Sequence, residues 1–318
     1  MRDRDRGRSK PSVTPTDVGT EGDFDAALNE ADEIRLTSDL NLTKLSTLTH
    51  DTVLDLNGHT LSSEAGTARP VSYLFTVNGC KLTLKNGTLQ TKYRIVNAVN
   101  GGEVVIENGT YNSTKDVAFS ATGEGSKVTM NGGKINAVEG GIGAFRKGEI
   151  EVNGGEITVS DNFCLFTNGS AGQGGNKITL NGGKLTGNIT SPGYEAIGVY
   201  IANNDIFVMN GGEILANNGT GLCMRAGNVT INDGKIVATG EAGRDGQIAD
   251  DSTIMTGTSA IIYHETANYP GKEGMTLTVN GGRIVSVDHS IQVLSNEAAP
   301  RVFVTGGNLT PPYPENNG

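Results

Sequence analysis

The sequence predicts an all-β chain folded as a right-handed, single-stranded parallel β-helix, a solenoid of about ten coils. Three observations predict this fold. A strand–turn–strand pattern recurs ten times between residues 54 and 309, most intervals between its copies contain one more strand-like run, and 46 glycines among 318 residues make the chain dense in turns. Because 36% of the residues are hydrophobic, the chain can bury a sizeable core, which excludes a disordered protein.

The recurring pattern has apolar residues at three fixed positions. In the copy IEVNGGEI these are Ile150, Val152 and Ile157, which lie five and three residues before, and two residues after, the aligned residue Gly155. All ten copies are apolar at these positions, with polar or small residues between them. Such alternation is typical of strands with one buried face, so each copy predicts two strands joined by a corner. The copies are LDLNGHTL, LTLKNGTL, VVIENGTY, VTMNGGKI, IEVNGGEI, ITLNGGKL, FVMNGGEI, VTINDGKI, LTVNGGRI and VFVTGGNL.

The corner between the two strands has its own residue preference. The residue just before the aligned one is Gly, Asn or Asp in every copy, and these residues adopt left-handed backbone angles at low cost. We therefore expect a left-handed corner at this position, for example at Gly154 and Gly281. Asparagine leads the corner seven times, and stacked coils would place these amides in a column that hydrogen-bonds from coil to coil. The seven are Asn57, Asn131, Asn153, Asn181, Asn210, Asn232 and Asn280.

The intervals between copies favour three strands per coil. Most of them contain a further run such as VAFSA, GIGAF, AIGVYI or SIQVL. A β-propeller is the alternative repeat fold, but each of its blades needs four antiparallel strands in roughly 40 residues. Most successive copies lie only 22 to 29 residues apart, so a parallel coil fits the spacing better.

The two ends of the chain differ from the repeat. Residues 23–31, DFDAALNEA, predict a short amphipathic helix with Asp23 as its N-cap, which would cover the first coil. The proline-rich residues 311–318 cannot continue a sheet. We therefore divide the chain into a flexible N-terminal attachment tail (1–22), a parallel β-helix (23–310) and a C-terminal tail (311–318).

The order of these segments resembles a known superfamily. A cap helix, then EIRLTSDLNL, then TVLDLNGHTL and a series of NGG coils resemble the pectate-lyase-like right-handed β-helices over residues 23–309. That superfamily includes pectin-cleaving enzymes, phage tailspikes, virion fibres and surface adhesins. The resemblance therefore implies the fold and leaves the function open.

Charge and hydropathy narrow the range of partners. The formal net charge is -10, and because the first ten residues carry five basic and two acidic side chains, the remainder carries -13. An acidic body repels nucleic acid, so we expect no nucleic-acid partner. No apolar run reaches the roughly 18 residues of a membrane span, so we expect no membrane partner either. The N-terminus lacks the hydrophobic stretch of a signal peptide, which favours synthesis in a host cytoplasm.

The N-terminal tail is a candidate attachment segment for a capsid or tail protein. Its arginines would steer it toward an acidic surface, and the uncharged stretch that begins at Val13 can add a strand to the edge of a partner's sheet. A solvated tail without a partner is the alternative interpretation. The candidate attachment residues are Arg2, Arg4, Arg6, Arg8 and Val13.

Catalytic motifs are sparse. Of the NTD, DD, GHG and RIK motifs that the polygalacturonase resemblance implies, only Asp250 and Asp251 match one piece, and no calcium-and-arginine arrangement of a pectate lyase is recognisable. Cys80, Cys164 and Cys223 are widely spaced, so we expect buried free thiols. The sequence predicts no cofactor and no metal site, and it favours a non-enzymatic role. The absence of tryptophan and the scattered tyrosines argue against an aromatic platform for sugars.

The longest interval of the repeat is the candidate binding site. Residues 238–274 depart furthest from the repeat, and a rod with uniform sides can recognise a ligand only where its side chains depart from that repeat. The interval holds side chains able to hydrogen-bond a glycan or a protein. A solvated loop, or a loop that supports a neighbour in a trimer, is the alternative. The candidate binding residues are Arg244, Asp250, Asp251, His264, Tyr269 and Lys272.

These observations favour a non-enzymatic structural or recognition protein on a particle surface. The expected class is a bacteriophage virion appendage, that is, a head fibre, a capsid decoration protein or a tailspike-like adhesin, with a host-surface glycan as a candidate ligand and a homotrimer as a candidate assembly. A polysaccharide lyase or hydrolase is one alternative function, and a bacterial cell-surface adhesin is another.

Overall fold

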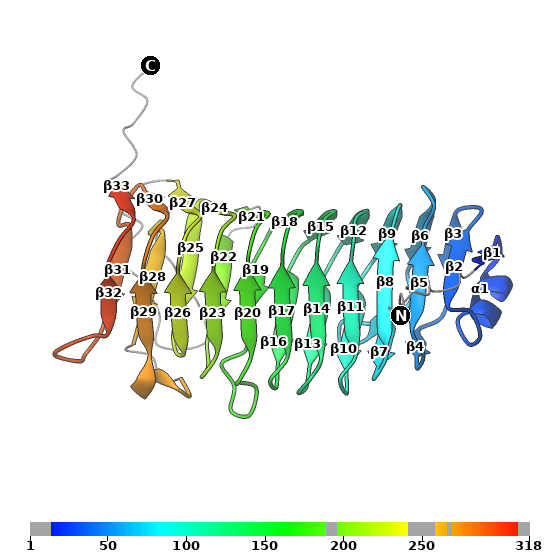
Figure 1. Ribbon diagram of the computed structural model, residues 1–318, viewed down its shortest axis with the longest axis horizontal. Helices are drawn as coiled ribbons and strands as arrows, with labels where there is room; N and C mark the ends of the chain where they lie inside the picture. The colour runs from blue at the N-terminus through cyan, green and yellow to red at the C-terminus, as the bar shows by residue number, and fades with distance from the viewer. Residues whose placement is uncertain (1–13, 189–195, 241–257, 266–268, 311–318) are drawn as a thin grey trace, which may run out of the picture.

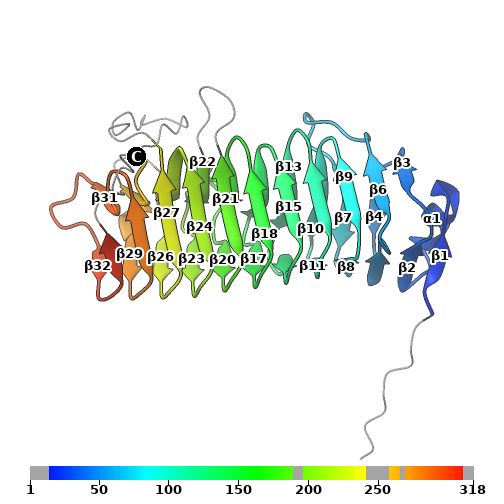
Figure 2. The same ribbon diagram turned by 90° about the horizontal axis from the view of Figure 1, so that it is seen from above.

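The computed structural model confirms an all-β parallel β-helix (Figure 1). It describes residues 14–188, 196–240, 258–265 and 269–310. Three parallel sheets of 12, 11 and 10 strands run along the rod, and we name them sheets A, B and C. The chain passes through one strand of each sheet in turn and then begins the next coil. Figure 2 shows the rod from above, with sheet B facing the viewer and sheet A along its lower side.

The described strands keep this order throughout. Sheet A contains β1 (Thr16–Val18), β2 (Glu33–Leu36), β5 (Thr52–Asp55), β8 (Lys81–Lys85), β11 (Glu103–Ile106), β14 (Lys127–Met130), β17 (Glu149–Val152), β20 (Lys177–Leu180), β23 (Ile206–Met209), β26 (Asn228–Ile231), β29 (Thr276–Val279) and β32 (Val302–Val304). Sheet B contains β3 (Leu40–Leu42), β6 (Thr60–Ser63), β9 (Thr88–Thr91), β12 (Thr110–Ser113), β15 (Lys134–Ala137), β18 (Glu156–Val159), β21 (Lys184–Asn188), β24 (Glu213–Asn217), β27 (Lys235–Thr239), β30 (Arg283–Ser286) and β33 (Asn308–Thr310). Sheet C contains β4 (Ser46–Leu48), β7 (Tyr73–Asn78), β10 (Arg94–Val99), β13 (Val117–Thr122), β16 (Gly140–Phe145), β19 (Phe163–Phe166), β22 (Ala196–Ile201), β25 (Gly219–Met224), β28 (Ile261–His264) and β31 (Ile291–Leu294).

The apolar positions of the repeat form the core, as predicted. In the fifth copy Ile150, Val152 and Ile157 are each 1% exposed. Full burial of such a side chain stabilises the fold by about 1.5–3 kcal/mol, so the stacked coils supply most of the driving force. The last copy differs, because Val304 and Leu309 remain 46% and 40% exposed where no further described coil stacks on them.

The left-handed corner lies one residue later than predicted in most copies. Gly155 has a φ of 87°, whereas Gly154 stays outside the left-handed region. Gly154 is required for another reason: a Cβ there would lie 2.7 Å from the carbonyl oxygen of Asn131 in the preceding coil. Only the first two copies turn at the predicted position, with φ values of 82° at Gly58 and 59° at Asn86.

The asparagine column is confirmed for six of its seven members. In five of the six the amide Nδ2 donates to the Oδ1 of the asparagine one coil before it, over distances of 2.8 to 3.0 Å. Asn131 begins the ladder: its Oδ1 accepts from Asn153, and its Nδ2 donates to Glu107 Oε2 at 3.2 Å. Asn57 stands apart, because its Nδ2 donates to the backbone oxygen of Leu36. The six that form the ladder are Asn131, Asn153, Asn181, Asn210, Asn232 and Asn280.

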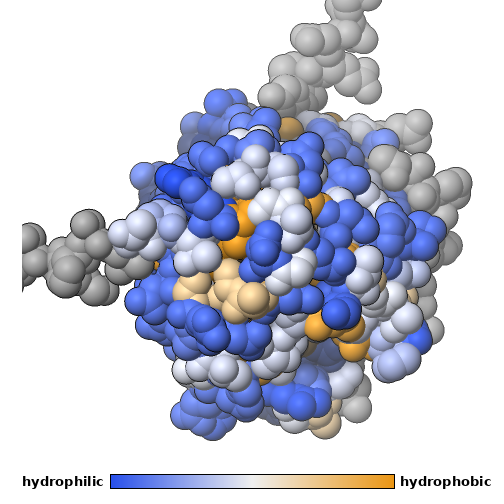
Figure 3. Space-filling view, turned by 90° about the vertical axis from the view of Figure 1, so that its right-hand side faces the viewer, coloured by the Kyte–Doolittle hydropathy of each residue, from blue (hydrophilic) through white to orange (hydrophobic). Residues whose placement is uncertain are grey.

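A helix caps the N-terminal end, although its boundaries differ from the prediction. Helix α1 (Glu21–Ala27) begins before Asp23, and Thr20 is its N-cap because the Thr20 hydroxyl accepts from the Asp23 backbone N–H. Phe24 is buried and packs 6.2 Å from the ring of Phe75, so the helix covers the open core as expected. Figure 3 shows this end as a largely hydrophilic face with small hydrophobic patches.

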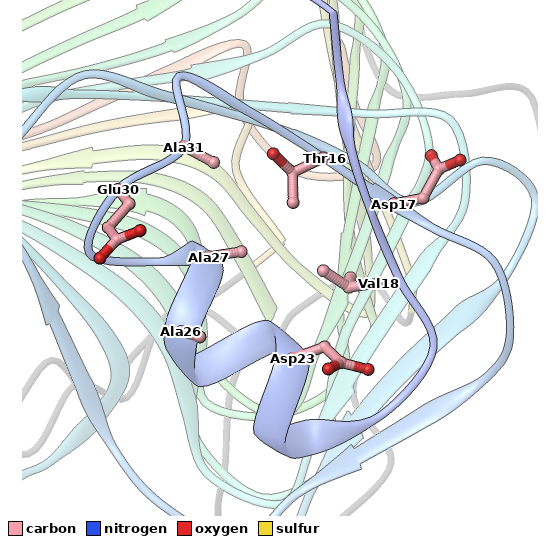
Figure 4. Close-up of a pocket in the computed structure, with 8 residues that line it drawn as sticks. All are labelled: Thr16, Asp17, Val18, Asp23, Ala26, Ala27, Glu30 and Ala31. Atoms are coloured by element: carbon pink, nitrogen blue, oxygen red, sulfur yellow. The ribbon is translucent and has the colours of Figure 1, made fainter.

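Strand β1 belongs to the body of the rod. It pairs in parallel with β2, with Thr16 opposite Ile34. The boundary that we drew at residue 22 therefore does not coincide with the first element of the sheet, while residues 1–13 lie outside the described residues. Figure 4 shows Thr16 and Val18 facing Ala27 and Ala31 across a shallow hollow between β1 and α1.

Two further expectations concern cysteines and membranes. Cys80, Cys164 and Cys223 are buried thiols that form no disulfide, as predicted. Within the part of the chain that the structure describes, no helix is long and apolar enough to cross a membrane.

Candidate functional site

Three of the predicted binding residues fall within the described residues, on β28 and on the segment that follows it. His264 ends β28 and is only 2% exposed, while Tyr269 and Lys272 are half-buried in the segment that leads into a 3-10 turn, η1 (Lys272–Gly274). The other candidate residues lie outside the described residues: Arg244, Asp250, Asp251, Arg2, Arg4, Arg6, Arg8 and Val13.

The outer face of sheet C changes character along the rod. In β7, β10 and β13 one outward column consists of Thr76, Asn97 and Ser120, which pair in this order. After Gly143 in β16, the same column continues with four largely apolar residues, and these contribute to a hydrophobic cluster separate from the main core. The four are Phe166, Tyr200, Cys223 and Ile262.

Aromatic rings gather on this apolar part of the face. Phe163 stacks on Tyr200 with ring centres 4.8 Å apart and planes 14° apart, and Phe145 meets Phe166 edge to face at 5.7 Å. Gly143 leaves room for them, because a Cβ there would lie 2.7 Å from the ring of Phe166. We call this set the outer aromatic strip; it comprises Phe145, Phe163, Phe166, Tyr200 and Tyr269.

The outer aromatic strip revises our expectation that no aromatic platform forms. Tyr200 and Tyr269 are 69 residues apart in sequence, yet their hydroxyl oxygens are 3.4 Å apart. Burial raises the pKa of Tyr200 far above its usual range, so its hydroxyl keeps its proton and remains a hydrogen-bond donor. The signal in the sequence was an aromatic residue within successive third strands of the coil, as in GIGAF, FCLF and AIGVYI.

Arg225 stands beside the strip in an unusual environment. It follows Met224, which pairs with Ile201 and Tyr263, so Arg225 lies on the outer face next to His264. Its side chain is fully buried and its guanidinium lies 5.2 Å from the centre of the Tyr269 ring. Among the residues that the structure describes, its Nε, Nη1 and Nη2 atoms have no hydrogen-bond partner. Sequence reasoning missed this residue, because nothing around it departs from the repeat.

A groove of about 530 Å³ lies at the corner between sheets C and A, next to the strip. Arg146 and Lys147 line it, and both have left-handed φ values, 55° and 71°. Backbone hydrogen bonds from their N–H groups to Gln173 and Gly174, of 2.8 and 3.1 Å, hold them there. Such strained residues cluster at functional sites. The remaining lining residues are Gly172, Gly174, Gly175, Asn203, Asn204, Pro270 and Gly271.

The strip and the groove together supply the elements of a recognition site. Flat apolar rings, amide groups and cationic side chains lie along one side of the rod, and such mixtures bind polar ligands. In the described residues, no three His, Cys, Asp or Glu side chains gather to hold a metal ion. No protein-family model, curated protein or solved structure matches this chain.

Proposed function

We propose that the protein is a non-enzymatic recognition protein displayed on a particle surface, in the class of bacteriophage virion appendages. Its ligand in this proposal is a host-surface glycan bound along the outer aromatic strip. The observation that carries the proposal is the row of rings, half-buried except for the buried Tyr200, beside a groove lined by amides and cations. Aromatic faces stack against the C–H faces of sugars, while amides and cations hydrogen-bond the hydroxyl groups.

The other outer faces of the rod support the choice of this side. Sheet A and sheet B carry repeated ion pairs between neighbouring coils, such as Lys127 with Glu151 at 2.6 Å and Lys235 with Glu213 at 2.8 Å. These half-exposed pairs contribute about 0–1 kcal/mol each and present the same chemistry at each step. A ligand can be distinguished only where the pattern changes, and on sheet C it changes from Thr, Asn and Ser to Phe and Tyr.

The test is glycan binding by a variant that loses the rings and keeps the apolar bulk. In the double variant Phe163→Leu and Phe166→Leu, leucine keeps the cluster buried but offers no flat face. Two ring contacts at about 0.5–1.5 kcal/mol each predict a loss of affinity of roughly 5- to 100-fold, measured by calorimetry on a glycan identified from an array. Phe303→Leu is the matched control, because Phe303 is 53% exposed on β32, away from the strip.

Three results would contradict parts of the proposal. Unchanged binding in the double variant would exclude the strip as the ligand surface. Release of shorter sugars from a polysaccharide panel would instead favour a lyase or hydrolase. A protein that does not copurify with intact virions, but is found on bacterial cells, would favour the adhesin.

A further inference from the structure

We propose that Arg225, together with the hydroxyl groups of Tyr200 and Tyr269, binds an oxyanion, a carboxylate, sulfate or phosphate group carried by the ligand. The inference deepens the proposed function and rests on it for the statement that the oxyanion belongs to a glycan. The oxyanion site itself rests on Arg225 and its surroundings.

The guanidinium of Arg225 is buried without a hydrogen-bond acceptor among the described residues. Arg225 is 0% exposed, and its five side-chain N–H donors make no hydrogen bond to any described residue. The face of the Tyr269 ring, 5.2 Å away, offsets only part of the cost of removing the charge from water. An oxyanion would supply both the missing charge and the missing acceptors, because a guanidinium and an oxyanion match in geometry.

Arg94 also lies over a tyrosine ring, but it is paired with a carboxylate of the same chain. Arg94 lies over the ring of Tyr73 at 5.4 Å, much as Arg225 lies over Tyr269. Its Nε donates to Asp116 Oδ1 at 2.9 Å, and its Nη1 donates to the Tyr73 hydroxyl at 3.0 Å. Arg225 has the aromatic ring but no carboxylate from the described part of the chain, so the comparison identifies the missing group as an anion.

The buried carboxylates at neighbouring corners have other partners. Asp205 Oδ1 accepts from the backbone N–H and the Nδ2 of Asn176, both at 2.9 Å. Glu265 accepts from the Ser295 hydroxyl at 2.6 Å. Neither of these two carboxylates hydrogen-bonds Arg225, so no carboxylate among the described residues neutralises its charge.

The two tyrosine hydroxyls fit the same ligand. They lie 3.4 Å apart, a loose contact that each can exchange for a bond to an acceptor. The Tyr269 ring is half-buried and covers the guanidinium, so the oxyanion must displace it to enter. A ligand that stacks on the outer aromatic strip would thus present its anionic group at the end of the strip.

The first experiment uses simple ions on the full chain. Thermal unfolding is followed in sodium sulfate, phosphate and acetate against sodium chloride at equal ionic strength, for the wild type, Arg225→Met and the control Arg94→Met. Binding to the native state should raise the wild-type Tm by about 5 °C at an ion concentration of about 100 times Kd. The general effect of kosmotropic ions acts on all three proteins alike, so only the difference between them counts.

The two arginine variants should respond in opposite directions. Without added ions, Arg225→Met should melt above the wild type, because it removes a buried unpaired charge, and it should lose the specific shift. Arg94→Met should melt below the wild type, because it leaves Asp116 without its partner, and it should keep the shift. If Arg225→Met keeps the full shift, the inference is wrong.

Two further variants test the same proposal if Arg225→Met does not fold. Tyr200→Phe and Tyr269→Phe retain the rings and the charge but remove one donor each, so each should weaken the ion-specific shift severalfold. If both variants keep the ion-specific rise in Tm of the wild type, the two hydroxyl groups do not bind the oxyanion and the proposal is wrong.

The source of the oxyanion is decided with glycans. A glycan that carries the preferred group should bind the wild type about 10- to 100-fold more tightly than its neutral analogue, and this preference should vanish in Arg225→Met. If Arg225→Met still prefers the anionic glycan over its neutral analogue, the oxyanion inference is wrong. The proposed function stands in that case if the double variant Phe163→Leu and Phe166→Leu still loses glycan binding. An Arg225-dependent ion shift without any glycan binding supports the oxyanion site and contradicts the proposed function.

Discussion

The corners of the coils allow backbone strain and steric contact to be separated by mutation. Gly58 has a φ of 82° with nothing within 4 Å of an added Cβ, whereas Gly154 lies outside the left-handed region but its Cβ would meet a carbonyl oxygen at 2.7 Å. Gly155 combines both constraints, with a φ of 87° and an added Cβ 2.7 Å from the carbonyl oxygen of Gly133. Alanine at each position therefore measures strain, contact and their combination.

The expected losses follow from these geometries. Gly58→Ala should lower the free energy of unfolding by about 1 kcal/mol, the cost of a left-handed alanine after the gain from a stiffer unfolded chain. Gly154→Ala should cost about 1–3 kcal/mol, because the stacked coils must separate to admit the methyl group. Gly155→Ala should cost about 2–4 kcal/mol if the two effects add.

The measurement is urea unfolding followed by circular dichroism, with asparagine variants as matched controls. Asparagine tolerates left-handed angles, so Gly58→Asn should recover most of the loss, while Gly154→Asn should not, since it keeps the obstructing Cβ. If Gly154→Ala is as stable as the wild type, or if Gly155→Ala costs no more than Gly58→Ala, the close approach between coils does not constrain these positions.

Three further predictions test the core, a buried acid and the tail. Ile231→Asp should abolish cooperative unfolding, because an unpaired buried carboxylate costs several kcal/mol, while Thr230→Asp on the outer face should melt normally. Burial raises the pKa of Asp205, so its protonated form contributes stability that is present below the unfolded pKa and lost as the pH rises through the folded pKa. Asp205→Asn should therefore stabilise the protein at pH 7, and urea titrations should show this advantage disappearing toward pH 3. Deleting residues 1–13, which precede β1, should leave the Tm unchanged and abolish binding to the particle; a truncated protein that still decorates particles would assign attachment to the body.

The coiled fold was predictable from the alternation of apolar and polar residues within each copy of the repeat. Val152 and Ile157 alternate with polar neighbours, and only a strand with one buried face matches that period, so the fold and most of the core were predictable. The asparagine ladder was predictable as well, because the asparagines occupy the same position in each coil and stacking places them next to one another. The choice between Gly154 and Gly155 as the left-handed residue was not predictable, because both are glycine and both lie against a carbonyl oxygen of the preceding coil. Only the backbone angles of the folded corner distinguish them.

The candidate site depended on tertiary structure. Phe166, Tyr200 and Arg225 each read as ordinary strand or corner residues, and they meet only because successive coils stack in register along sheet C. The intervals between coils vary in length, so the chain separation of two residues does not reveal whether they share a column. Sequence alone thus determined that this chain coils, through the period of its apolar residues. The stacking of the coils decided which side chains meet on its surface, and it left the guanidinium of Arg225 buried without a hydrogen-bond partner among the described residues.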